Sequence, residues 1–334
     1  MSAVPSSSPR GAAMADAQPQ PAFPPVTAPL LKVAAQDVDD GTTQAMARTP
    51  ATATAIGGTA AAIPTPVAPV LRIAWRDDSA NPGRRMVATE IPVALTYARA
   101  THAVMLATPA DLEDFAIGFS LAEGIIRTPA DILSLDIVPL PEGIECRMDV
   151  TGERLNALTR RQRRLAGPSG CGLCGLDSLA DAIRPVPRVA KGMAFSPAMI
   201  RNAMLAMPAA QALNAETRAV HAAAFWTPDC GLIALREDVG RHNALDKLAG
   251  AMARQAIDAA TGMILLSSRV SVEMVQKTAM IGAPVLVAVS APTSLAIQTA
   301  EAAGITLVGI ARADGCEVFT YPERITLQAD HHGG

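Results

Sequence analysis

The chain has 334 residues, of which 50% are apolar and 18% are charged, and its formal net charge is −3. This length and composition are typical of a globular protein of about two domains, and the slight negative charge argues against a general nucleic-acid binder, which needs a basic surplus. No stretch reaches the ~18 consecutive apolar residues of a membrane span and the N-terminus lacks a secretory pattern, so we expect a cytoplasmic protein that binds neither membranes nor nucleic acid.

Residues 1–70 differ in composition from the rest of the chain. They hold 11 of the 26 prolines and a single aromatic residue, Phe23, and runs such as ATATAIGGTAAAIPTPVAP have no helical or strand period. Such a segment buries too little apolar area to offset the entropy lost on ordering. We expect a disordered extension over 1–70, or alternatively a partner-binding arm, and a flexible tail over 327–334.

Residues 71–165 predict a smaller, β-rich α+β subdomain. Alternating apolar and β-branched residues indicate strands; the predicted strands cover residues 71–75, 88–98, 102–108, 131–140 and 143–151. Thr108 followed by Pro109 predicts the N-cap and first position of a helix that continues to about residue 125.

Residues 181–326 alternate between strand and helix patterns. The predicted strands cover 231–239, 262–268, 284–290 and 305–311, and the predicted helices cover 240–258, 270–282 and 294–303. Alternation of this kind is typical of right-handed crossover units on a largely parallel sheet. We therefore expect an α/β core with a ligand crevice in this region.

Two cysteines, Cys171 and Cys174, lie in the glycine-rich segment GPSGCGLCG at 167–175. The glycines predict a mobile loop over 166–180. A structural zinc site needs four ligands, and the other cysteines and histidines of the sequence show no second paired spacing. The zinc-dependent base deaminases need the motifs H-x-E and P-C-x-x-C. Both motifs are missing from this sequence, which argues against a deaminase. A structural zinc site and a thioredoxin-like redox pair stay open as minor alternatives, and the favoured interpretation is a thiol that carries sulfur as a persulfide.

Polar residues follow four successive predicted strands. Asp238 is a candidate helix N-cap, and ligands of α/β sheets bind at the carboxyl ends of strands, where helix N-termini attract anions. Small, hydroxylic or basic residues lie at Arg241, His242, Ser267, Ser268, Arg269, Ser290, Thr293, Ser294 and Arg312. They predict a site for an anionic ligand such as a nucleotide phosphate. We expect His221 to be a core residue and Glu273 with Lys277 to be an ordinary surface pair.

Longer motifs resemble the formate dehydrogenase accessory sulfurtransferase family, FdhD. The motifs are LEDFAIGFSLAEGII at 112–126, GCGLCG at 170–175, VHAAAF at 220–225, EDVGRHNALDKLAG at 237–250, SSRVSVEMVQKTAM at 267–280 and VSAPTSLAIQTAEAAGITLVGIARADG at 289–315. The resemblance implies a mixed sheet flanked by helices, similar to cytidine deaminase, with a smaller N-terminal β-rich subdomain. It also implies a homodimer.

The resemblance further implies a sulfur carrier without a metal of its own. Sulfur would pass from a cysteine desulfurase to the molybdenum bis(guanine dinucleotide) cofactor of a formate dehydrogenase, with Cys171 carrying the persulfide and Cys174 supporting it. The implied cofactor-binding residues are Ile310, Ala311, Arg312, Ala313, Asp314 and Gly315; additional crevice residues are Arg241, His242, Ser268 and Arg269. A thiol–disulfide oxidoreductase and a non-catalytic cofactor chaperone are the alternatives.

The sequence departs from the family pattern at two places. Arg218 follows Thr217 where the family usually has glycine, and Ala313 with Asp314 replaces a more basic or glycine-rich usage. The first departure concerns the backbone before His221, and the second lies within the implied cofactor segment.

Overall fold

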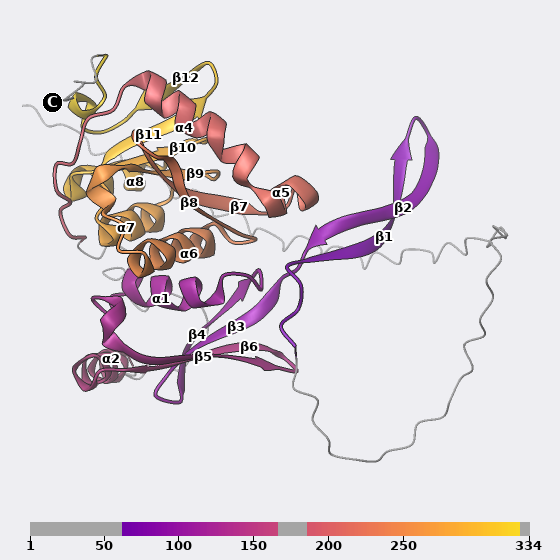
Figure 1. Ribbon diagram of the computed structural model, residues 1–334, viewed down its shortest axis with the longest axis vertical. Helices are drawn as coiled ribbons and strands as arrows, with labels where there is room; N and C mark the ends of the chain where they lie inside the picture. Colours follow the sequence, from indigo (N-terminus) through magenta and orange to yellow (C-terminus); the bar gives the residue numbers. More distant parts are fainter. Residues whose placement is uncertain (1–61, 166–185, 328–334) are drawn as a thin grey trace, which may run out of the picture. The chain divides into compact units, whose positions relative to one another are not determined.

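The computed structural model describes residues 62–165 and 186–327, so Cys171 and Cys174 lie outside the described residues. Within these ranges the strands form three sheets of two, four and six strands (Figure 1). The two-stranded sheet is an antiparallel hairpin of β1 (Val67–Arg76) and β2 (Ser79–Ala88). Strand β1 therefore begins inside the segment that we expected to be a disordered extension.

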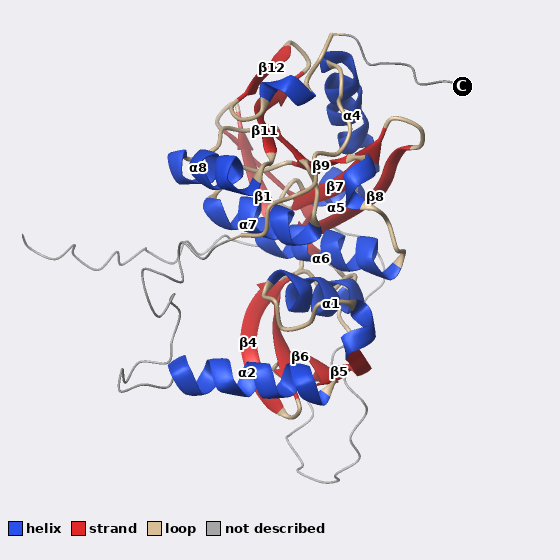
Figure 2. Cartoon of the chain, turned by 90° about the vertical axis from the view of Figure 1, so that its left-hand side faces the viewer, coloured by secondary structure: helices blue, strands red, loops and turns tan. Residues whose placement is uncertain are grey.

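The four-stranded sheet has the order β4-β3-β6-β5. Its strands are β3 (Ile91–Tyr97), β4 (Ala100–Ala107), β5 (Ile132–Leu140) and β6 (Gly143–Val150), and the 3-10 turn η1 (Pro129–Asp131) precedes β5. Apolar side chains at alternate positions bury one face of this sheet against helix α1 (Leu112–Ala122). Figure 2 shows α1 lying over the sheet. Helix α2 (Gly152–Leu165) follows β6. The predicted strands of this region are confirmed.

The predicted start of the first helix is wrong. Helix α1 begins at Leu112 after Asp111, whose φ of 52° is left-handed. Thr108 is fully buried, and its hydroxyl accepts a hydrogen bond from the backbone N–H of Val239, 3.1 Å away. A tertiary contact thus uses the hydroxyl that the sequence pattern assigned to capping.

The six-stranded sheet has the order β12-β11-β10-β9-β7-β8. Its strands are β7 (His221–Thr227), β8 (Gly231–Asp238), β9 (Met263–Leu266), β10 (Val285–Ala288), β11 (Thr306–Arg312) and β12 (Gly315–Val318). Strands β9, β10 and β11 are parallel, whereas β7, β8 and β12 pair antiparallel with their neighbours. The mixed α/β fold is confirmed, and the expectation of a largely parallel sheet holds only for its centre.

Helices cover both faces of this sheet (Figures 1 and 2). One face packs on α6 (Arg241–Arg254), α7 (Val272–Ile281) and α8 (Ser294–Ala303), and the other packs on α4 (Pro197–Ala210). Shorter elements are α5 (Ala212–Thr217), η2 (Ala259–Thr261) and η3 (Pro322–Arg324). None of the helices in the described ranges has the length and apolarity that a membrane crossing requires.

Helices α1 and α6 pack closely because each presents a glycine to the other. A Cβ on Gly118 would overlap the backbone of Asp246, and a Cβ on Gly250 would overlap the backbone of Asp114. Close packing of this kind tolerates no added side chain without a shift of the backbone. The contact fixes the four-stranded subdomain against the six-stranded one.

Candidate functional site at the strand ends

The ends of five strands meet at one edge of the six-stranded sheet. The carboxyl ends of β9, β10 and β11 lie there because these strands are parallel, and β8 ends where β7 begins because His221 pairs with Asp238. The hydroxyl of Ser267 accepts the backbone N–H of Ala222 at 2.8 Å, which ties β7 to the end of β9. We call this place the strand-end edge. The topology therefore places at this edge the polar residues that the sequence predicted to follow the strands.

Asp238 has a different role from the predicted one. Helix α6 is capped by Gly240, and Asp238 is fully buried. Its carboxylate lies 2.7 Å from the ammonium of Lys247, which is also fully buried, and accepts the backbone N–H of Thr108 at 2.9 Å. A buried carboxylate needs such partners, so Asp238 joins the two subdomains. The prediction of Asp238 as an N-cap is wrong.

Arg241 is the first residue of α6, at the strand-end edge, and one of its N–H groups lacks a hydrogen-bond acceptor among the described residues. Its Nε is buried and has no hydrogen-bond partner among the described residues. Its charge acts on His221, whose pKa is lowered mainly by burial and further by Arg241. A buried N–H without an acceptor is costly, and an anion at the edge is one group that would satisfy it.

His242 lies beside Arg241 and is held by groups from α7. Its Nε2 is 3.0 Å from Oε2 of Glu273 and 3.5 Å from the hydroxyl of Ser271. Burial lowers the pKa of His242, with a smaller opposing contribution from Glu273. No sequence pattern indicated Ser271 as a neighbour of His242, because the two residues are 29 positions apart.

The expected surface pair of Glu273 and Lys277 does not exist. Lys277 is buried and binds the carboxylate of Asp246 on α6 at 2.6 and 2.8 Å. Burial raises the pKa of Asp246 to about 6, against the opposing attraction of Lys277. Lys277 thus pairs with Asp246 on the neighbouring helix α6, although its i,i+4 spacing on α7 predicted a pair with Glu273.

Ser268 and Arg269 extend from β9 at the same edge. Ser268 is buried and its hydroxyl donates to the carbonyl of Arg269 at 3.1 Å, whereas Arg269 is exposed. Thr293 caps α8, since its hydroxyl accepts the N–H of Ala296 at 3.3 Å, as predicted for the helix start. Helices α6 and α7 have no such side-chain cap, so their first N–H groups are left for other acceptors.

The segment 310–315 contains the end of β11 and the turn into β12, and its backbone is strained. Ile310 has a φ of 50°, and the pairing of β11 with β12 shifts register between Gly309 and Arg312. A β-branched residue with positive φ is an outlier that only its surroundings maintain; here its N–H donates to the carbonyl of Ser290 at 3.3 Å. The strain therefore lies just beyond the last residue pair of β10 with β11, Val287 with Val308.

Side chains of the segment 310–315 differ in accessibility. Ala311 is buried in the core beneath α4, while Arg312, Ala313, Asp314 and Gly315 are exposed. A cavity of about 300 Å³ lies between this segment and α4, lined mostly by apolar side chains and by Arg201 and Arg312. The segment thus offers backbone groups and one guanidinium to a ligand.

Arg218 ends α5 in the left-handed region, with a φ of 57°. Glycine adopts this conformation without the steric cost that a Cβ imposes. The departure from the family pattern at this position therefore replaces a residue suited to the turn by one that is strained there, three residues before His221.

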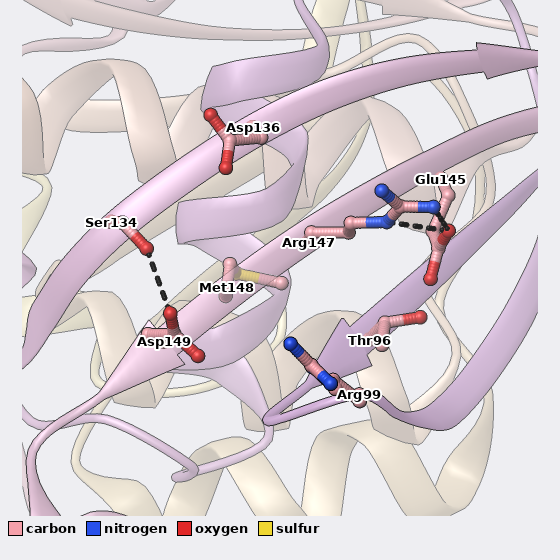
Figure 3. A pocket seen from close by; sticks show the side chains of 8 residues that line it. All are labelled: Thr96, Arg99, Ser134, Asp136, Glu145, Arg147, Met148 and Asp149. Carbon is pink, nitrogen blue, oxygen red and sulfur yellow. Dashed lines mark hydrogen bonds and ion pairs between the residues drawn. The ribbon is translucent and has the colours of Figure 1, made fainter.

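Other chemistry in the described residues is sparse. The described cysteines are Cys146, Cys230 and Cys316, all free, and no three His, Cys, Asp or Glu residues of the described ranges are grouped as metal ligands. A second cavity, of about 530 Å³, lies on the exposed face of the four-stranded sheet (Figure 3). It contains an internal Arg147–Glu145 ion pair at 2.7 Å and none of the predicted site residues.

Comparison with known proteins identifies the family. Residues 88–326 match the model of the FdhD/NarQ family, and this range includes Cys171 and Cys174. The sulfur carrier protein FdhD of Agrobacterium fabrum is 51% identical over 77% of this chain and 96% of its own, and that of Bordetella petrii is 48% identical over 72% and 87%.

A solved structure has the same fold. The crystal structure of a formate dehydrogenase accessory protein from Desulfotalea psychrophila superposes with a TM-score of 0.61 at 24% identity, covering 78% of this chain and 99% of that one. At this identity the likeness concerns the fold alone. The family match over 88–326, together with relatives that share 48–51% of its residues, shows that the chain belongs to the FdhD/NarQ family.

Proposed function

We propose that the protein is a sulfur carrier that serves a formate dehydrogenase. The observation that carries the proposal is the pair Cys171 and Cys174 inside a family match whose relatives are named sulfur carrier proteins. Among the cysteines of the described ranges, Cys146 is buried and burial raises its pKa to about 12, which suppresses the reactive thiolate. The glycine-flanked pair is the better candidate for thiol chemistry.

Sulfur loading is proposed to be a thiol exchange. The Cys171 thiolate attacks the outer sulfur of the persulfide on a cysteine desulfurase, a new S–S bond forms on Cys171, and the desulfurase cysteine leaves as a thiolate. No external oxidant is needed, because one S–S bond replaces another. Cys174 supports the reaction as the neighbouring thiol.

The proposed recipient is the molybdenum bis(guanine dinucleotide) cofactor, bound as a substrate at the strand-end edge. The residues proposed to hold it are Ile310, Ala311, Arg312, Ala313, Asp314 and Gly315, with Arg241, His242, Ser268 and Arg269. The Nε of Arg241, which has no partner among the described residues, and the starts of α6 and α7, which lack a side-chain cap, suit the phosphates of such a ligand. We further propose that the protein acts in the cytoplasm as a homodimer.

Mass spectrometry of the Cys171 peptide tests the proposal after incubation with a cysteine desulfurase and cysteine. We expect an added sulfur on Cys171 in the wild type, its loss in Cys171→Ala, and its retention in the control Cys230→Ala, which changes an exposed cysteine of the β7–β8 turn. Undiminished labelling of Cys171→Ala would refute the assignment. A Cys171–Cys174 disulfide with insulin reductase activity would instead support a thiol–disulfide oxidoreductase.

Binding of the recipient is tested separately with GDP as the probe, because it carries the guanine and phosphates of the cofactor. Isothermal titration should show that Arg241→Gln weakens GDP binding by at least tenfold. The control Arg99→Gln changes an exposed arginine of the Figure 3 cavity and should leave binding unchanged. Equal affinity of wild type and Arg241→Gln would place the nucleotide elsewhere.

A further inference from the structure

His242 and Glu273 form a contact between the first turns of two helices at the strand-end edge. His242 is the second residue of α6 and Glu273 is the second residue of α7. Nε2 of the imidazole lies 3.0 Å from Oε2 of the carboxylate, and the hydroxyl of Ser271 donates to the same oxygen at 3.0 Å. The imidazole is thus tied to α7 through one of its two ring nitrogens.

This contact determines which ring nitrogen of His242 carries the proton. A carboxylate has only acceptors, so the hydrogen of the 3.0 Å contact belongs to Nε2. Burial lowers the pKa of His242, and Glu273 opposes this effect. Arg241 and Lys277 lower the pKa further, so the imidazole is uncharged at neutral pH. An uncharged imidazole has a single N–H, which leaves Nδ1 as a hydrogen-bond acceptor.

Nδ1 of His242 is accessible to a ligand. Within the described residues, the hydrogen bonds of this side chain are all made by Nε2. The buried side-chain nitrogens and oxygens that lack a partner in these residues are Oγ1 of Thr89 and Nε of Arg241, so Nδ1 is not a buried atom. The His242 side chain is 29% exposed. A ligand can therefore reach Nδ1 from the solvent.

The backbone beneath the two side chains is held in place on both helices. At the start of α6, the side-chain amide of Asn243 donates to Oδ1 of Asp238 at 3.0 Å and to the carbonyl of Leu106 at 2.8 Å. Just before α7, the carbonyl of Val270 accepts the N–H of Thr293 at 3.0 Å. The geometry of the pair is therefore fixed before a ligand binds, as precise recognition requires.

Two consecutive residues of α6 offer opposite hydrogen-bonding functions. Nε–H of Arg241 is a donor without an acceptor in the described part of the chain, and Nδ1 of His242 is an acceptor without a donor. A ligand that satisfies both has an anionic group and also an O–H or N–H donor. A nucleotide has both, because its ribose hydroxyls and the amino group of guanine are donors, whereas a simple anion satisfies Arg241 alone.

We propose that Glu273, supported by Ser271, is a positioning residue that holds His242 in the tautomer with an accepting Nδ1, and that Nδ1 binds a donor on the ribose or base of the ligand. A hydrogen bond at one ring nitrogen is a general means of setting the function of the other. The inference rests on the nucleotide-bearing ligand of the proposed function and assigns the residue that distinguishes this ligand from a simple anion.

Nitrogen-15 NMR of the full-length protein tests the tautomer, because protonated and unprotonated ring nitrogens have well-separated chemical shifts. At about pH 8, where histidine is neutral, we expect the proton of His242 on Nε2 in the wild type. In Glu273→Gln the new amide can donate to Nε2, so the Nδ1–H tautomer should become populated. The ring should also protonate at lower pH, because Glu273 raises its pKa. A proton on Nδ1 in the wild type would overturn the proposal.

Calorimetric titrations with GDP and with inorganic pyrophosphate separate positioning from simple electrostatics. If charge alone mattered, removing the negative charge of Glu273 would strengthen the binding of any anion. We expect instead that Glu273→Gln and His242→Phe weaken GDP binding roughly fivefold, the effect of one hydrogen bond. Pyrophosphate has neither ribose nor guanine, so both variants should bind it at least as tightly as the wild type does. The matched control Glu301→Gln removes an exposed carboxylate from α8 and should bind both compounds as the wild type does.

Dideoxy-GDP, which lacks both ribose hydroxyls, identifies the donor. If the ribose supplies it, the wild type should bind dideoxy-GDP as weakly as His242→Phe binds GDP; if guanine supplies it, the affinity of the wild type should not change. GDP binding that neither Glu273→Gln nor His242→Phe weakens would overturn the inference and leave the proposed function intact. A wild type that binds no GDP would refute the proposed ligand site as well, and labelling of Cys171 would still decide the sulfur-carrier function.

Discussion

Replacing Lys247 by methionine removes a cation from the interior of the protein. The Lys247 and Asp238 side chains are both 0% exposed and lie 2.7 Å apart, and Lys247 also donates to the carbonyl of Thr108 at 2.9 Å. Removing one partner of a buried pair leaves an uncompensated charge, which costs about 3–5 kcal/mol. Asp238 keeps the N–H donors of Thr108 and Gly240, so we expect the lower end, about 3 kcal/mol.

Urea unfolding followed by circular dichroism measures this cost as a lower midpoint at an unchanged slope. The matched control is Arg254→Met on the same helix, because Arg254 has ion pairs of similar length, 2.8 Å to Glu113 and 2.9 Å to Asp114, but is 44% exposed. Asp114 also keeps Arg236 at 2.7 Å. We expect the control to cost less than about 1 kcal/mol; equal losses for the two variants would refute the argument from burial.

Three further predictions concern strain, packing and protonation. The free energy of unfolding of Arg218→Gly should exceed that of Arg218→Ala by up to about 1 kcal/mol, because glycine adopts the positive φ of this position without strain. A glycine variant that is less stable than the alanine variant in urea unfolding would contradict this. Gly250→Ala should destabilise by about 1–3 kcal/mol because its Cβ meets the backbone of α1, whereas Gly152→Ala, with open space around its Cβ, should have little effect in the same assay. In NMR titrations, His221 and His242 should protonate below the ordinary pKa of 6.5, because burial lowers both pKa values. The stability that these neutral side chains contribute is therefore present above pH 6.5 and is lost as pH falls below it. A titration midpoint above 6.5 for either histidine would refute the assignment.

Local patterns predicted most of the fold. Alternation along β5 and β6 and the crossover pattern from β9 to β11 are properties of short segments, and they appear where expected. Strand β7 was not predicted, because its run of three alanines has low strand propensity. Without β7, its antiparallel hairpin with β8 could not be predicted, and the sheet was expected to be more parallel than it is.

The candidate site was predictable to the extent that it follows from topology. Parallel strands place their carboxyl ends together, so the alternation of strands and helices along the chain was enough to assign Ser268 and the segment after β11 to one edge. Ion pairs between helices could not be assigned in this way. Asp246 and Lys277 are 31 positions apart, and the spacing of Glu273 and Lys277 on their own helix indicated a different pairing.

Two strained residues near the site differ in how far their residue types reveal the strain. Arg218 stands where the family resemblance leads us to expect glycine, and its positive φ explains why glycine suits that position. Ile310 has a φ of 50° with no signal in its residue type, since β-branched residues favour extended backbone. Its conformation is imposed by the register shift and by the bond to Ser290. Because strain of this kind persists only where the surroundings over-determine the backbone, no local sequence pattern could have predicted the conformation of Ile310.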